Sequence, residues 1–259
     1  MKIVFSNNAD RYLKERLSRL PLTKQLVFGL VCSERMFPIF IKFSKDTSWK
    51  TPESVRHFID MLWNYAEHPE SIEFTADDLE VAAELVPDTD DEDLYDSDED
   101  DLLDAACYAS GSVAFLIKTI VEGGDMSKTS MVIANNELIE SLAGYVEIFL
   151  EESDDETFPY MEENFEQTLA EALQNPLNSF EVVSDEANDK RRDETEHVRN
   201  VRCCPLIQRE LRLLLDVLND IETCDDIAEL RKKYGNCTDG CLCYQDAKSG
   251  KIKIRPFWK

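Results

Sequence analysis

The stretch Leu17–Phe43, LSRLPLTKQLVFGLVCSERMFPIFIKF, holds the longest run of apolar residues at helical spacing in this chain. Leu26-Val27 and Leu30-Val31 recur four residues apart, which predicts a buried helix. A charged pair, Glu34-Arg35, interrupts the apolar stripe. Because charges that are buried must be paired or hydrogen-bonded, we expect both side chains to have polar partners. We expect the helical pattern to end at Pro38, since proline disrupts a helix interior.

Most of the remaining chain also shows helical patterns, and only 8 Gly and 9 Pro interrupt them. The predicted fold class is all-α: a multi-helix bundle with an acidic loop between helices. Four segments are expected: a helical core domain, a polar linker or insertion, C-terminal helices that pack on the core, and a Cys-rich basic tail that is irregular or a β-hairpin. In the same order, these segments span residues 1–174, 175–203, 204–235 and 236–259. Further helices are expected at about 51–66, 75–87, 102–121, 127–151 and 205–221. Residues 10–31 are also expected to be helical, and Pro21 either divides this helix in two or opens its second part.

Charge is spread unevenly along the chain, whose formal net charge is −26. Residues 57–189 hold 2 basic and 37 acidic side chains, and no Lys or Arg lies between Arg56 and Lys118. Nucleic-acid binding by this block is not expected, because phosphate binding needs cations. An acidic surface can instead attract a basic protein or only keep the chain soluble. No signal peptide or membrane-length apolar run is evident, which predicts a cytoplasmic protein without membrane contact.

Two sets of residues have side chains of the kinds that bind metal ions. Asp88, Asp90, Glu92, Asp96 and Glu99 follow the spacing of a calcium-binding loop, but Asp93 stands where the sharp turn needs glycine. In the tail, Cys237, Cys241 and Cys243 offer three thiolates for zinc, with Cys224 or His197 as a fourth ligand. The paired spacing of structural zinc sites is absent. Neither signal is specific, so no metal and no cofactor is predicted.

Catalytic signatures are missing from the sequence. It has no glycine-rich phosphate loop, no nucleophile elbow and no HExxH motif, and only 3 His. The run Ser127-Lys128-Thr129-Ser130 has residue types that some hydrolases use, but a helix start capped by Ser127 explains it more simply. No catalytic residue is assigned, and an enzyme is the less favoured interpretation.

Several of these segments resemble one known family. The run Cys32–Phe43 contains Cys32, Glu34, Arg35, Met36, Phe37 and Pro38, and it is joined by Phe58–Trp63 and Ser127–Ser130. Together they resemble the bacterial YjaG-like family, domain of unknown function 416, although Phe37 stands where members usually have Tyr. The resemblance implies an all-helical cytoplasmic protein without an established activity. It also implies a link to immunity against bacterial toxins, since some relatives are associated with that role.

The favoured hypothesis is a soluble binding protein, an immunity protein that neutralises a basic toxin such as a nuclease through its acidic region, residues 73–104. The expected contact residues are Asp90, Asp91, Asp93, Leu94, Tyr95 and Asp96. The alternative is a helical metal-dependent enzyme or a regulatory module that uses inward carboxylates such as Glu34. Homo-oligomerisation is left open.

Overall fold

The computed structural model describes residues 2–5, 8–88, 102–136, 142–144, 146, 176–177, 180–183 and 204–255. Within these ranges it has eight α-helices and two small antiparallel sheets, so the predicted all-α fold class is confirmed. The helices are α1 (Asn8–Leu17), α2 (Leu22–Thr47), α3 (Pro52–Glu67), α4 (Ala76–Ala83), α6 (Leu103–Glu122), α7 (Met126–Asn135), α11 (Pro205–Thr223) and α12 (Ile227–Tyr234). The strands are β1 (Lys2–Phe5), β2 (Phe180–Val183), β3 (Cys243–Gln245) and β4 (Ile252–Ile254).

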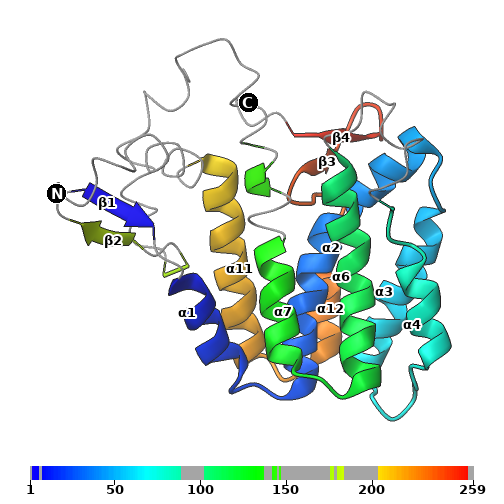
Figure 1. Ribbon diagram of the computed structural model, residues 1–259, viewed down its shortest axis with the longest axis horizontal. Helices are drawn as coiled ribbons and strands as arrows, with labels where there is room; N and C mark the ends of the chain where they lie inside the picture. Colours follow the sequence, from blue (N-terminus) through cyan, green and yellow to red (C-terminus); the bar gives the residue numbers. More distant parts are fainter. Residues whose placement is uncertain are drawn as a thin grey trace.

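Helix α2 lies at the centre of the fold. It packs against α3, α6, α7, α11 and α12 and against both strands of the C-terminal hairpin. Figure 1 shows it between the α6–α7 pair and the helices behind, with the hairpin over one end of the bundle. Eighteen of its 26 residues are buried, as expected for a helix that is surrounded on all sides.

The predicted end of this helix was wrong, because α2 continues through Pro38 to Thr47. A proline inside a helix costs about 3 kcal/mol through a lost hydrogen bond and a steric clash. Ile39, Phe40 and Phe43 follow it and are fully buried. Each such side chain contributes about 1.5–3 kcal/mol of hydrophobic stabilisation, and together they outweigh the cost of the proline.

Local sequence signals set the boundaries of the other helices. Pro21 divides the first helical pattern, because it stands as the N-cap between α1 and α2. Pro52 occupies the first turn of α3. The apolar side chains of α3 at helical spacing are buried, namely Val55, Phe58, Ile59, Leu62, Trp63 and Ala66. A capping box between Thr75 and Asp78 begins α4, and Gly123, with φ of 66°, ends α6 in the left-handed conformation.

Helix α6 is 20 residues long and apolar enough, by length and composition alone, to cross a membrane. This differs from the expectation that the chain has no apolar run of membrane-spanning length. In the structure 56% of the most apolar window of α6 is buried, and the helix packs against α2, α4 and α7. These contacts are those of a core helix in a globular bundle.

One of the two sheets is a local hairpin, and the other joins segments that are far apart in the chain. Strands β3 and β4 form an antiparallel hairpin with Tyr244 opposite Lys253, which is the β-hairpin alternative predicted for the tail. Strand β1 pairs with β2, with Lys2 opposite Val183 and Phe5 opposite Phe180. This second pairing was not anticipated, since β2 lies in the segment expected to be a linker. The division into four segments remains a prediction.

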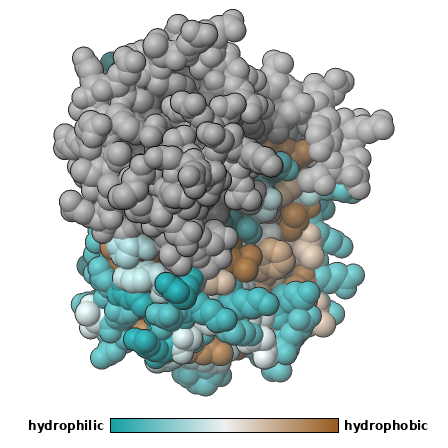
Figure 2. Space-filling model, turned by 60° about the vertical axis from the view of Figure 1, so that its left-hand side comes forward, coloured by the Kyte–Doolittle hydropathy of each residue, from teal (hydrophilic) through white to brown (hydrophobic). Residues whose placement is uncertain are grey.

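The described surface is mainly hydrophilic on the face drawn in Figure 2, with some hydrophobic side chains gathered on its right-hand part. Among the described residues the large hydrophobic side chains that are exposed are Leu22, Val81, Phe115 and Val132. A few exposed apolar side chains are normal for a globular protein. Of these four, Val81 lies among exposed carboxylates of α4.

Candidate functional site

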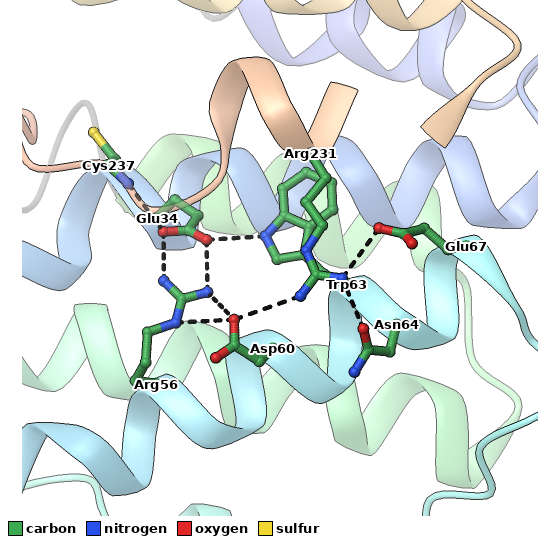
Figure 3. A network of polar contacts seen from close by, with 8 residues as sticks. All are labelled: Glu34, Arg56, Asp60, Trp63, Asn64, Glu67, Arg231 and Cys237. Carbon is green, nitrogen blue, oxygen red and sulfur yellow. Dashed lines mark hydrogen bonds and ion pairs between the residues drawn. The ribbon is translucent and has the colours of Figure 1, made fainter. Parts of the chain in front are cut away.

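Glu34 projects from α2 into a buried polar cluster. Its side chain is fully buried and accepts two parallel hydrogen bonds from Arg56, from Nη1 to Oε2 and from Nη2 to Oε1, both 2.8 Å long. Trp63 Nε1 donates to Oε1 at 2.9 Å, and the backbone N–H of Cys237 donates to Oε2 at 3.3 Å. Figure 3 shows how these donors surround the carboxylate. Both oxygens of Glu34 are therefore occupied.

Arg56 extends the cluster along α3 to α12. Its Nη2 also donates to Asp60 Oδ1 at 2.8 Å, and Asp60 lies 3.7 Å from Arg231 of α12. Arg231 reaches back to Glu67 at 3.1 Å (Figure 3). Burial is the largest single influence on Arg56 and lowers its pKa, but the hydrogen bonds and negative charges of Glu34 and Asp60 together outweigh it, so the pKa lies above the ordinary value. The arginine thus stays charged and links α2 to α3.

Arg35, the next residue of α2, pairs with Glu210 of α11. Its Nε donates to Glu210 Oε2 at 3.0 Å and its Nη2 donates to Oε1. A second arginine, Arg209, donates from Nε to the same Oε1 at 3.2 Å. Nη1 of Arg35 donates to the carbonyl oxygen of Asp239 and lies 3.4 Å from the thiol of Cys237. Glu210 is fully buried, so two buried carboxylates are each held by arginines.

The hydrogen bonds of Glu34 and Glu210 are relevant to the alternative hypothesis, in which inward carboxylates act in catalysis or bind a metal ion. A general base or a metal ligand needs an oxygen lone pair that faces substrate or metal. The lone pairs of Glu34 and Glu210 instead face guanidinium, indole and backbone N–H groups. Across the described ranges no group of three His, Cys, Asp or Glu side chains is placed to hold a metal ion. The cluster is built to connect helices.

Neither metal hypothesis gains support. Cys241 and Cys243 are buried in the core, and in the described part of the chain they form no metal-holding group with Cys237 or Cys224. Burial raises the pKa of the Cys243 thiol to about 12, so this thiol is protonated at neutral pH in the structure. His197 lies outside the described residues. Of the calcium-like loop only Asp88 is described, so that hypothesis is left without a structural test.

The run Ser127–Ser130 lies at the start of α7, where it stabilises the helix. The N-cap is Asp125 rather than Ser127: its Oδ1 accepts from the backbone N–H of Lys128 at 3.2 Å and from the hydroxyl of Ser127 at 2.6 Å. The hydrogen bond from Ser127 is the main reason that the pKa of Asp125 lies below its ordinary value. Ser127 therefore supports the cap without forming it.

The other two hydroxyls of this run connect α7 to its neighbours. Thr129 Oγ1 lies 2.7 Å from Thr119 Oγ1 of α6, and Ser130 Oγ donates to the carbonyl of Gln25 on α2 at 2.7 Å. A Cβ at Gly29 would lie only 2.8 Å from Ser130 Oγ, so glycine allows the close approach of α2 and α7. These family-like residues have packing roles in the structure.

The six expected contact residues, Asp90, Asp91, Asp93, Leu94, Tyr95 and Asp96, lie outside the described residues. The described part of the acidic region is a surface on and beside α4, here called the acidic α4 surface: Glu73, Asp77, Glu80, Val81 and Glu84. All five side chains are exposed, and Val81 is 50% accessible. Helix α4 packs on α6 with Ala82 buried, which turns these residues outward.

Glu210 is the main cluster residue that the sequence reading missed. A signal for it exists, since Arg209-Glu210 interrupts the apolar stripe of α11 just as Glu34-Arg35 interrupts that of α2. Two charged pairs inside two buried stripes point to a mutual contact, because buried charges need partners. Arg56 has no comparable signal.

Comparison with known proteins gives a family and a fold. A family model described as protein of unknown function (DUF416) matches residues 12–99. A crystal structure of a DUF416 family protein from Shewanella baltica OS155 is similar to this structure with a TM-score of 0.56 and 17% sequence identity. The similarity covers 85% of this chain and 92% of the other. No curated protein matches. The resemblance to domain of unknown function 416 is therefore confirmed over residues 12–99, and the described chain has the fold of a DUF416 protein, whereas the YjaG-like naming stays a prediction.

Proposed function

We propose that this protein is a cytoplasmic binding protein that docks a basic protein partner through the acidic α4 surface and the acidic segment that follows it. A toxin such as a nuclease is the favoured partner, which would make the chain an immunity protein. The observation that carries the proposal is the uncompensated negative charge of the acidic α4 surface. Proteins use such surfaces to attract cationic partners and to orient them.

Each carboxylate of the acidic α4 surface lacks a cationic partner among the described residues. No Lys or Arg occurs between residues 57 and 117, and no described residue forms an ion pair with Glu73, Asp77, Glu80 or Glu84. On α3, Asp60 is paired with Arg56 of the same helix and with Arg231 of α12, and Glu67 is paired with Arg231. Carboxylates needed for folding are therefore paired, whereas those of the acidic α4 surface face solvent.

The charges toward the C-terminal end of α4 cost local stability, whereas Asp77 in the first turn favours the helix. Glu80 and Glu84 stand four residues apart on one helix, a like-charge spacing that destabilises a helix by about 0.2–0.5 kcal/mol. Glu84 lies at the C-cap, where the helix dipole disfavours a negative charge. A pattern that opposes helix stability supports a role in binding.

Val81 gives the surface an apolar contact point among the carboxylates. Long-range attraction between opposite charges speeds encounter, whereas desolvation of an apolar side chain slows dissociation. Charge steering is screened by salt, with a Debye length of about 10 Å at 0.1 M ionic strength. Binding through this surface is therefore expected to weaken steeply with salt.

The test is an affinity capture from the native host at low salt with full-length tagged protein, followed by mass spectrometry. The test variant carries Asp77→Asn, Glu80→Gln and Glu84→Gln. A matched control removes three exposed carboxylates elsewhere: Glu15→Gln, Asp216→Asn and Glu229→Gln. Both variants change net charge by the same amount, so a difference between them reflects position.

The expected result is a basic protein that salt releases, that the control retains and that the test variant loses. With the purified partner, the test variant should slow association at low salt while the control does not. A second variant neutralises Asp90, Asp91, Asp93 and Asp96 and should have the same effect. Equal capture or equal association rates for all variants would overturn the proposal.

A further inference from the structure

A groove lies between the start of α11, residues 238–239 and the C-terminal hairpin, on a part of the molecule that the proposed function does not use. It is called the hairpin groove here, and its volume is about 940 Å³. Small-molecule sites commonly have volumes of about 300–1,000 Å³. Its lining combines apolar groups of Leu206 and Ala247 with polar groups of Thr238 and Gln245 and the guanidinium groups of Arg209 and Arg255.

The hairpin groove lies in a segment of net positive charge within this acidic protein. Residues 237–255 contain four basic side chains and two acidic ones. Of the two, Asp246 is paired with Lys253 at 2.5 Å, and that hydrogen bond is the main reason that its pKa falls to about 2. Asp239 is paired with Arg255. The two lining carboxylates are thus already neutralised by cations.

Arg255 has an unused hydrogen-bond donor. Its Nη2 pairs with Asp239 Oδ1, and its guanidinium carbon lies 5.9 Å from the centre of the Tyr244 ring. Its Nη1 is buried and has no hydrogen-bond partner among the described residues. A buried donor without an acceptor costs about 1–3 kcal/mol, and more for a charged group. An acceptor supplied from outside would remove that cost.

Arg209 provides a second cation from the opposite wall. Its bonds to Glu210 use Nε and Nη2, and none of its bonds to described residues uses Nη1. Glu210 is also held by Arg35, so the position of the carboxylate does not depend on Arg209 alone. Two guanidinium groups on two elements suit a carboxylate or phosphate group, whose oxygens match the arginine fork.

We propose that the hairpin groove binds a small organic anion whose carboxylate or phosphate group lies between Arg209 and Arg255. The apolar remainder of the ligand contacts Leu206, Ala247 and the ring of Tyr244. Because Nη1 of Arg255 is closed to solvent in this structure, a small rotation of the guanidinium accompanies binding. This site is separate from the acidic α4 surface and accepts ligands of the opposite charge.

The test uses full-length protein and two probes, inorganic pyrophosphate and malonate, each measured by isothermal titration calorimetry against sodium chloride of equal ionic strength. Saturable one-to-one binding of either probe is expected, and the preferred probe identifies phosphate or carboxylate as the ligand group. Arg209→Gln should weaken binding at least tenfold. Ala247→Trp, which fills the groove and keeps every charge, should do the same.

The matched control is Lys248→Gln, which removes one positive charge from the same hairpin outside the lining. It should bind within twofold of the wild type, and thermal unfolding should show that all variants fold. The proposal is overturned if neither probe binds beyond chloride, or if Lys248→Gln weakens binding as much as Arg209→Gln does. The triple variant of α4 should bind the probes normally, so this result does not depend on the proposed partner.

Discussion

Replacing Glu34 by glutamine tests whether the buried cluster holds the helices together. Glutamine keeps the shape of the side chain but removes its charge and turns an NH₂ group toward the donors of Arg56 or Cys237. Breaking a buried ion pair costs about 3–5 kcal/mol. Arg56 retains Asp60 and is 20% exposed, which favours the lower end of that range. A donor left unsatisfied adds about 1 kcal/mol.

Glu34→Gln is therefore expected to lower the free energy of unfolding by about 4 kcal/mol, a large part of the ~5–15 kcal/mol that native proteins have. The assay is urea unfolding followed by tryptophan fluorescence, for which Trp63 in the cluster is a direct reporter. The control is Asp46→Asn, which breaks the partly exposed pair with Lys42 on the same helix. The control should cost no more than about 0.5 kcal/mol.

A double-mutant cycle with Arg56→Gln should give a coupling energy of at least ~2 kcal/mol, because the two residues contact each other directly. If Glu34→Gln costs less than about 1 kcal/mol, or no more than the control does, the reasoning is refuted. Glu34 would then be free for another role.

Two further predictions concern the tail. Gly240→Ala should lower the free energy of unfolding by more than about 2 kcal/mol in the same urea assay, since the added Cβ would collide with the carbonyl oxygen of Arg35. Gly250→Ala is the control. No atom lies within 4 Å of its added Cβ, but φ is +64°, so it should cost only about 1 kcal/mol. Burial raises the pKa of Cys243 from 9.0 to about 12, so the unfolded chain loses that proton first and stability should fall as pH rises from about 9 toward 12. Cys243→Ala should reduce the fall in urea midpoint between pH 8 and pH 10.5, and an unchanged fall would contradict this assignment.

Local patterns were enough to predict most helices. The six buried positions of α3 follow from apolar spacing and from Pro52, because both signals lie within one helix. The end of α2 was mispredicted because Pro38 is a local signal, whereas the burial of Ile39 and Phe40 that overrides it depends on other helices. Single-helix reasoning does not include that energy.

The candidate site was predictable only in part. That Glu34 and Arg35 need partners followed from their apolar surroundings. Glu210 lies 175 residues from Arg35, so the contact is indicated only when the charged pairs of α2 and α11 are compared and not by either helix alone. The same limit applies to β1 and β2, whose four-residue strands pair across more than half of the chain. The hairpin groove arises only when α11 meets the tail, so no contiguous motif marks it.

The contact between the tail and α2 has a consequence for protein synthesis. The backbone N–H of Cys241 donates to the carbonyl of Arg35 at 2.9 Å, one turn before Pro38, and Cys237 donates to Glu34. Helices near the N-terminus leave the ribosome first and begin to fold there. The polar groups in the middle of α2 nevertheless remain without these two donors until residues 237–241 have been synthesised. A chain that stops at α12 would expose Pro38 and the buried charges beside it, and cellular proteases would distinguish it from a chain that includes the hairpin.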